Sequence, residues 1–235
     1  MPSTFSPCSL LIHTTLPARF PREAASSARV TPHFFPAHVT LTSEIPPARY
    51  GDEPQAWLDG VDFSSLGGFH SRSGSGSQSG LSGGGIDTHK VTTVVRFERV
   101  ESQDVFYRRC FVRVGFEGVR ALAGVARAVG VLGEGVEVDR DPDGGVRFGE
   151  GTEKWLSSWR AEFGPHLSLM YGDEPISEET LKEITKVVQQ AGVKLSDEET
   201  GATEEGGGWD GGVIWLVPTD KPISEWGKPI ATRQL

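Results

Sequence analysis

The chain has 235 residues, a formal net charge of −9 and two cysteines, Cys8 and Cys110. This length suits one substantial domain or a domain of two lobes. The negative charge disfavours a protein that wraps long nucleic acid, because that function needs a basic face. The cysteines form no C-x-x-C pair, so neither a disulfide framework nor a zinc site is predicted. No apolar run reaches the roughly 18 residues that a membrane-spanning helix needs.

The N-terminal segment has two interpretations. Residues 1–22 contain no acidic residue and are rich in Ser and Thr, which is typical of a mitochondrial targeting segment. Alternatively, Leu10–Pro17 is the end of a short core helix. The residues of this segment fit both interpretations.

A strand-like run follows at His38–Leu41, in which a histidine and a threonine alternate with apolar residues. In a strand, His38 and Thr40 point to one face and the two apolar side chains to the other. Pro46-Pro47 ends this strand, and Pro54–Leu58 predicts a short helix.

Glycine and serine dominate residues 64–90. Such a segment cannot bury enough apolar surface to offset its ordering entropy, so we predict a disordered insertion there. It contains neither the Gly-Lys-Ser/Thr ending of a phosphate-binding P-loop nor the G-x-G-x-x-G spacing of a dinucleotide site.

Apolar and polar residues alternate again after the insertion. The runs Val91–Phe97 and Val105–Phe116 predict a β-hairpin that turns at Glu101–Asp104. Helical spacing then predicts a helix over Gly118–Val131, and Asp139–Gly151 is expected to form a turn-rich acidic loop.

The last part of the chain alternates helices with strands. Thr152 is predicted to cap a helix whose aromatic face ends at Phe163, and Ser177 to cap a further helix that closes at Gly192. Val213–Val217 is the predicted last strand. Hairpins and helices mixed without regular βα alternation indicate an α+β fold.

The segment His166–Leu169 repeats the pattern of His38–Leu41: a histidine, an apolar residue, a hydroxyl residue and another apolar residue. If the two strands lie side by side, both imidazoles and the hydroxyls of Thr40 and Ser168 converge on one groove. Two imidazoles can move two protons, and two hydroxyls can donate hydrogen bonds to one phosphate. The pair predicts metal-free hydrolysis of a phosphodiester, with catalytic histidines and phosphate-binding hydroxyls. For either histidine alone, the alternative is a buried core residue.

Residues around the two motifs carry a family resemblance. They are Phe34–Pro36, His38–Ser43, Asp104–Phe111, Pro165–Asp173 and Val213–Val217. Through them the chain resembles the fungal 2′,3′-cyclic-nucleotide 3′-phosphodiesterases of the two-histidine phosphoesterase superfamily. The resemblance implies one domain over residues 1–235, with two lobes related by an approximate twofold that each give one histidine strand to a central cleft. It favours the helix at Leu10–Pro17. It also implies an apolar strand before that helix, for which residues 1–9, with two prolines, are poorly suited, so we expect an incomplete N-terminus.

The resemblance also implies an activity. It is the opening of 2′,3′-cyclic nucleotides to 2′-phosphates, and of the ADP-ribose 1″,2″-cyclic phosphate left after tRNA splicing to a 1″-phosphate. The resemblance favours His166 as the base and His38 as the acid. We expect no metal, no cofactor and no membrane span, a small-molecule substrate rather than long nucleic acid, and a monomer. The fungal relatives imply an intracellular location, in the cytoplasm or at the Golgi, rather than in mitochondria.

Several points stay open. The protein could instead be a non-catalytic module that binds phosphate or RNA ends, or an RNA-end-processing enzyme for longer RNA, which would need a basic track beside the cleft. Tyr171 would point away from the cleft in a regular strand, but a bend there would turn it toward a nucleobase. Arg108 and Arg109 could help to bind phosphate or simply cover the sheet, and only one of them can face the cleft.

Overall fold

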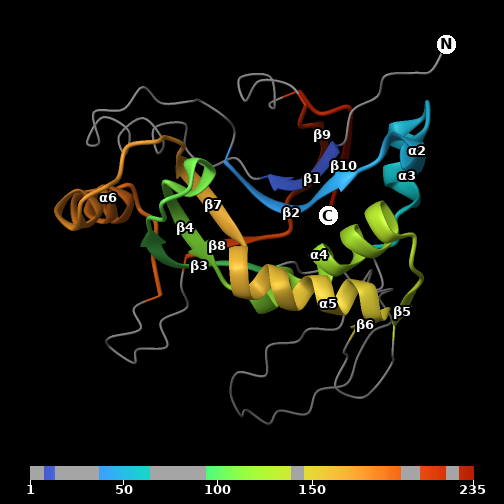
Figure 1. Ribbon diagram of the computed structural model, residues 1–235, viewed down its shortest axis with the longest axis horizontal. Coiled ribbons are helices and arrows are strands. Elements are labelled where there is room, and N and C mark those ends of the chain that lie inside the picture. The colour runs from blue at the N-terminus through green and yellow to red at the C-terminus, as the bar shows by residue number, and fades with distance from the viewer. Residues whose placement is uncertain (1–7, 14–36, 64–93, 139–145, 197–206, 221–227) are drawn as a thin grey trace, which may run out of the picture.

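The computed structural model describes residues 8–13, 37–63, 94–138, 146–196, 207–220 and 228–235 (Figure 1). The insertion predicted at 64–90 lies outside these residues. The strands are β1 (Cys8–His13), β2 (His38–Ile45), β3 (Val94–Glu101), β4 (Cys110–Val114), β5 (Val136–Val138), β6 (Val146–Phe148), β7 (His166–Met170), β8 (Gly208–Asp210), β9 (Val213–Pro218) and β10 (Ala231–Gln234). The helices are α2 (Pro47–Tyr50), α3 (Pro54–Gly60), α4 (Phe116–Arg127), α5 (Glu150–Ser158) and α6 (Glu178–Gln190), with short helical turns η2 (Phe106–Arg108), η3 (Ala128–Leu132) and η4 (Trp159–Phe163).

Eight of the described strands form one sheet in the order β10-β9-β1-β2-β7-β4-β3-β8, and every neighbouring pair is antiparallel. The two histidine strands, β2 and β7, are therefore neighbours at the centre of the sheet (Figure 1). The helix α4 packs against β2 and β3, and α5 lies beside α4. This arrangement confirms the α+β class, whereas a twofold relation between two lobes stays a prediction.

One buried apolar cluster holds these elements together. Val39 of β2, Leu167 of β7 and Val119 of α4 belong to it, and each is almost fully buried. Removing such side chains from water is the main favourable contribution to folding. The apolar half of each histidine strand therefore anchors the strand, while the other half is available for chemistry.

The helix predicted at Leu10–Pro17 is wrong in its described part. Cys8–His13 forms β1, which pairs with β2 on one side and β9 on the other. Cys8, Leu10 and Leu11 are buried. A short apolar run that is buried on both faces has no strand periodicity, so its pattern cannot be distinguished from that of a buried helix.

Other expectations are mostly confirmed. The hairpin is formed by β3 and β4, but the predicted run Val105–Phe116 is a strand only at Cys110–Val114, because Phe106–Arg108 forms the turn η2. The helix α4 continues through η3 to a left-handed Gly133. Ser177 caps α6 by accepting a hydrogen bond from the backbone N–H of Thr180. Strands β8 and β10 were not predicted, so the predicted last strand, Val213–Val217, is followed by another strand. The loop predicted at Asp139–Gly151 is wrong in part, because it contains β6, which pairs with β5, and the start of α5.

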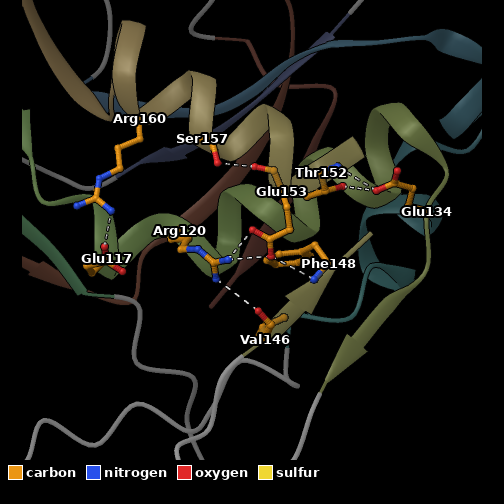
Figure 2. Close-up of polar contacts among 9 residues, drawn as sticks. All are labelled: Glu117, Arg120, Glu134, Val146, Phe148, Thr152, Glu153, Ser157 and Arg160. Atoms are coloured by element: carbon orange, nitrogen blue, oxygen red, sulfur yellow. Dashed lines mark hydrogen bonds and ion pairs between the residues drawn. The ribbon is translucent and has the colours of Figure 1, made fainter. Parts of the chain in front are cut away.

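The cap predicted for α5 is also wrong. The helix begins at Glu150, so Thr152 lies inside its first turn. The Thr152 hydroxyl and backbone N–H instead donate to the Glu134 carboxylate, at 2.6 and 3.1 Å (Figure 2). A second link joins α5 to α4, where Arg120 contacts both carboxylate oxygens of Glu153 at 2.8 Å. These contacts fix the helix that carries Trp155.

The Glu134–Thr152 contact gives a stability prediction. Glu134→Ala leaves a fully buried hydroxyl without its acceptor, which costs about 1–3 kcal/mol. At roughly 2–4 °C per kcal/mol for a chain of this size, we expect Tm to fall by several degrees in calorimetry. Because Thr152→Val removes the other partner, the double variant should lose less than the sum of the two single losses.

The matched control is Glu150→Ala, which removes an exposed carboxylate from the same helical turn and should change Tm little. A Glu134→Ala protein that melts at the wild-type temperature would show that the carboxylate does not stabilise α5.

Candidate active site

The pairing of the histidine strands builds the floor of the site. Val39 of β2 lies directly opposite Leu167 of β7. In an antiparallel pair, the residues on either side of this position face the other surface of the sheet. His38 is therefore opposite Ser168, and Thr40 is opposite His166. Each imidazole has the other strand's hydroxyl across from it, and the two imidazoles lie on a diagonal.

All four side chains line one cavity of about 380 Å³. Aromatic residues from two other parts of the chain line it as well. Tyr107 comes from the turn η2 and Tyr171 is the residue after β7, and their rings meet edge to face at 5.5 Å. Trp155 and Trp159 come from α5 and η4 and stack nearly parallel, at 5.2 Å between ring centroids. The cavity thus combines a polar floor with aromatic sides, as is common in small-molecule sites.

The surroundings of His166 fix its tautomer and its charge. Its Nδ1 lies 3.0 Å from the carbonyl oxygen of Gly164. Since a carbonyl only accepts, Nδ1 carries the proton and donates, which leaves the lone pair on Nε2. The pKa of His166 is lowered to about 4, chiefly by burial and also by the nearby charges of Arg108, His38 and Arg113, while the Gly164 carbonyl acts in the opposite direction. His166 is neutral at pH 7 and can accept a proton.

The main chain at Gly164 holds that carbonyl in place. Gly164 has φ 59, in the left-handed region that side-chain-bearing residues rarely adopt. A Cβ atom at this position would also approach the Arg113 guanidinium at 3.1 Å. A glycine therefore allows the chain to turn from η4 into β7 with its carbonyl directed at the imidazole.

Neither Arg108 nor Arg109 is among the residues that line the cavity. The Arg109 guanidinium donates to the carbonyls of Gly172 and Asp173 at 2.9 and 3.0 Å, so it fixes the segment that follows β7. Arg108 is buried near His166 and donates to the Glu162 carbonyl at 2.8 Å. The guanidinium groups of both arginines therefore contact carbonyls of neighbouring segments and do not line the cavity, although the buried Nε of Arg108 has no hydrogen-bond partner among the described residues.

Tyr171 does line the cavity, but only 4% of it is exposed. Phe106 and Tyr107 pack against its ring, at 6.0 and 5.5 Å between centroids. Its hydroxyl hydrogen-bonds Ser168, and burial raises its pKa to about 12, so the phenol keeps its proton. Stacking of a nucleobase on Tyr171 stays a prediction; the contact that the structure gives is to the Ser168 hydroxyl.

Several residues of the cavity were not predicted from the sequence. Trp155 and Trp159 were expected only as part of a helix, although their i, i+4 spacing places both on one face of the helical segment formed by α5 and η4. Tyr107 and Arg127 gave no such signal. Tyr107 lines the cavity because it lies in the turn η2, and Arg127 lines it because α4 packs against β2.

Two general features bear on the expected chemistry. Among the described residues, no three His, Cys, Asp or Glu side chains form a group that could hold a metal ion. None of the helices in the described ranges has the length and apolar character needed to cross a membrane.

Comparison with known proteins identifies the family. The family described as "Cyclic phosphodiesterase-like protein" matches residues 2–235. The chain belongs to this family. It is 47% identical over 229 residues to the "2′,3′-cyclic-nucleotide 3′-phosphodiesterase" of Neurospora crassa, covering 97% of this chain and 91% of the relative. It is 37% identical over 206 residues to the protein of the same name from Phaeosphaeria nodorum, covering 86% of this chain and 82% of that relative. The resemblance noted from the motifs is confirmed.

The environment of His166 gives a prediction that does not depend on any substrate. A pKa near 4, below the usual 6.5, means that the ring becomes protonated only in acid and stays neutral from pH 5 to pH 8. We expect a long-range ¹H–¹⁵N NMR titration to give that midpoint, with nitrogen shifts of the Nδ1–H tautomer. Loss of the signals in His166→Gln assigns them. A midpoint near 6.5, or a protonated Nε2 at neutral pH, would contradict the geometry described.

Proposed function

We propose that this member of the cyclic phosphodiesterase family hydrolyses 2′,3′-cyclic nucleotides and ADP-ribose 1″,2″-cyclic phosphate. The products are a 2′-phosphate and, from ADP-ribose, a 1″-phosphate, which connects the protein to the by-products of tRNA splicing. The observation that carries the proposal is the diagonal pair of imidazoles, each opposite a hydroxyl residue, on the floor of one cavity. The names of both curated relatives support the part of the proposal that concerns 2′,3′-cyclic nucleotides.

The two histidines divide the proton transfers. His166 Nε2 takes a proton from water as the water oxygen bonds to phosphorus, because this nitrogen carries the lone pair. The bond between phosphorus and the 3′-oxygen breaks, and protonated His38 gives its proton to that leaving oxygen. Return of one proton from His166 to His38 through solvent restores the enzyme. A water attack in line with the leaving oxygen needs acid and base on opposite sides of the phosphorus, which a diagonal pair provides.

The two hydroxyls stabilise charge on the phosphate. Neither proton transfer requires Thr40 or Ser168, so their hydroxyls serve as hydrogen-bond donors to the non-bridging oxygens. The Ser168 hydroxyl is held by the Tyr171 hydroxyl and donates to the Tyr107 carbonyl oxygen at 3.4 Å, a long hydrogen bond that it would exchange for one to the phosphate. Because the hydroxyls bind the phosphate oxygens and the histidines move both protons, we propose that the reaction needs no metal.

We also propose that the chain is one domain with two lobes. Three strands lie outside β2 on one side of the sheet and three lie outside β7 on the other. Each group of four strands would be one lobe, and the cavity would lie above the junction between them.

The central test is removal of each imidazole. His38→Ala and His166→Ala should each lower kcat for adenosine 2′,3′-cyclic phosphate by roughly 10²–10⁴, while circular dichroism shows a folded protein. The wild-type reaction should continue in EDTA and give adenosine 2′-phosphate, which chromatography separates from the 3′ isomer. A folded histidine variant with near-normal turnover, or activity that EDTA abolishes and zinc restores, would contradict the mechanism.

Hydroxyl variants serve as the internal comparison. Thr40→Val and Ser168→Ala each remove one hydrogen bond to a charged group, so kcat/KM should fall by roughly 10- to 150-fold without a change in the shape of the pH profile. Thr232→Val, on strand β10 and outside the cavity, is the control and should leave kcat/KM unchanged. Loss of one limb of the pH profile in Thr40→Val would place that hydroxyl in the proton path.

A further inference from the structure

Arg127 is the one Lys or Arg side chain among the described residues that line the cavity. It is the last residue of α4, and it reaches the cavity together with Ser43 and Glu44 near the end of β2. His38 and Thr40 lie toward the other end of the same strand. The cavity therefore extends from the proposed reaction site at one end to a cation at the other, and the mechanism above makes no use of that cation.

The hydrogen-bonding capacity of Arg127 is poorly used. Its Nη1 lies 3.5 Å from the Ser43 carbonyl oxygen and 3.7 Å from a Glu44 carboxylate oxygen. Its Nε is buried without a partner among the described residues, and only 15% of the side chain is exposed. By contrast, Arg120 on the same helix contacts both oxygens of Glu153 at 2.8 Å (Figure 2). A largely buried guanidinium with such long contacts can gain much from an anion.

Trp155 holds this guanidinium in a fixed orientation. The Arg127 guanidinium carbon lies over the indole ring, 5.1 Å from its centroid, and Trp159 stacks on the same indole. An arginine that stacks on an aromatic face keeps its N–H groups at the edge of the stack, where they can bind a phosphate with two parallel hydrogen bonds.

The spacing of residues along β2 determines which phosphate of a substrate could reach Arg127. Thr40 and Glu44 are four residues apart, which is about 13 Å in a strand. A phosphate held by Thr40 cannot also contact Arg127 over that length. A second phosphoryl group on the far side of one sugar ring can contact Arg127, because the arginine side chain spans part of the distance between the two sites.

Glu44 would compete with such a phosphoryl group for the Arg127 guanidinium. Its side chain is 78% exposed and faces Arg127 at the long distance given above. Its backbone has φ 65, which is uncommon for a residue with a side chain and is often found at binding sites. Its negative charge would repel a phosphate that approaches Arg127.

We propose that Arg127, stacked on Trp155, binds a phosphoryl group on the 5′ carbon of the sugar whose cyclic phosphate is hydrolysed. The proposal rests on the proposed function and names its substrate class: cyclic phosphates that also carry a 5′-phosphate or 5′-pyrophosphate. ADP-ribose 1″,2″-cyclic phosphate has this feature and adenosine 2′,3′-cyclic phosphate lacks it.

The test compares adenosine 2′,3′-cyclic phosphate with the same compound phosphorylated at the 5′-oxygen. Wild-type kcat/KM should be at least tenfold higher for the 5′-phosphorylated substrate. Arg127→Gln should lower kcat/KM for that substrate by roughly 10- to 100-fold and change it less than threefold for the other. Glu44→Gln should raise kcat/KM for the 5′-phosphorylated substrate alone, by roughly two- to fivefold, because it removes a like charge.

Lys186→Gln is the control, since it removes an exposed cation of α6 that does not line the cavity, and it should not alter the ratio between the two substrates. Equal losses on both substrates in Arg127→Gln, or none, would overturn the proposal. If Arg127→Gln fails to fold, absence of the gain in Glu44→Gln overturns it instead. A wild-type protein that hydrolyses neither substrate contradicts the proposed function itself, which is a distinct result.

Discussion

The pairing of Val39 with Leu167 at the centre of the sheet is the constraint on which the site depends. Both side chains are buried, and their burial fixes which face each strand turns inward. A slip of one residue between β2 and β7 would bury the hydroxyls and expose the apolar residues. Hydrophobic burial therefore sets the positions of His38 and His166, although neither imidazole contributes to the apolar core.

The environment, rather than the residue type, separates the proposed roles of the two histidines. His166 donates from Nδ1 to the Gly164 carbonyl and lies near the buried cation Arg108, and burial lowers its pKa, so it is neutral at pH 7. The acidity of the whole chain has little bearing on this local field, because nearby groups dominate inside a protein. A protein with a net charge of −9 can thus hold a cationic end, Arg127, in the same cavity.

Much of this arrangement could be predicted from local patterns. Alternation in two H-x-[ST] segments indicated that each histidine shares a face with a hydroxyl, and the structure places all four around one cavity. Strand β1 could not be predicted, since a short apolar run buried on both faces has no periodicity. The start of α5 could not be predicted either, because Thr152 hydrogen-bonds Glu134, which lies 18 residues earlier in the chain. The position of Arg127 in the cavity depends on how α4 packs against β2, and no local sequence pattern encodes that packing.

The central claim is that His166 activates water and does not itself attack phosphorus. The stereochemical course at phosphorus tests it most directly, with a single isomer of adenosine 2′,3′-cyclic phosphorothioate hydrolysed in ¹⁸O-labelled water. One in-line displacement by water predicts inversion of configuration. Retention would show two successive displacements through a phosphohistidine, and would contradict the assignment of His166 as a general base.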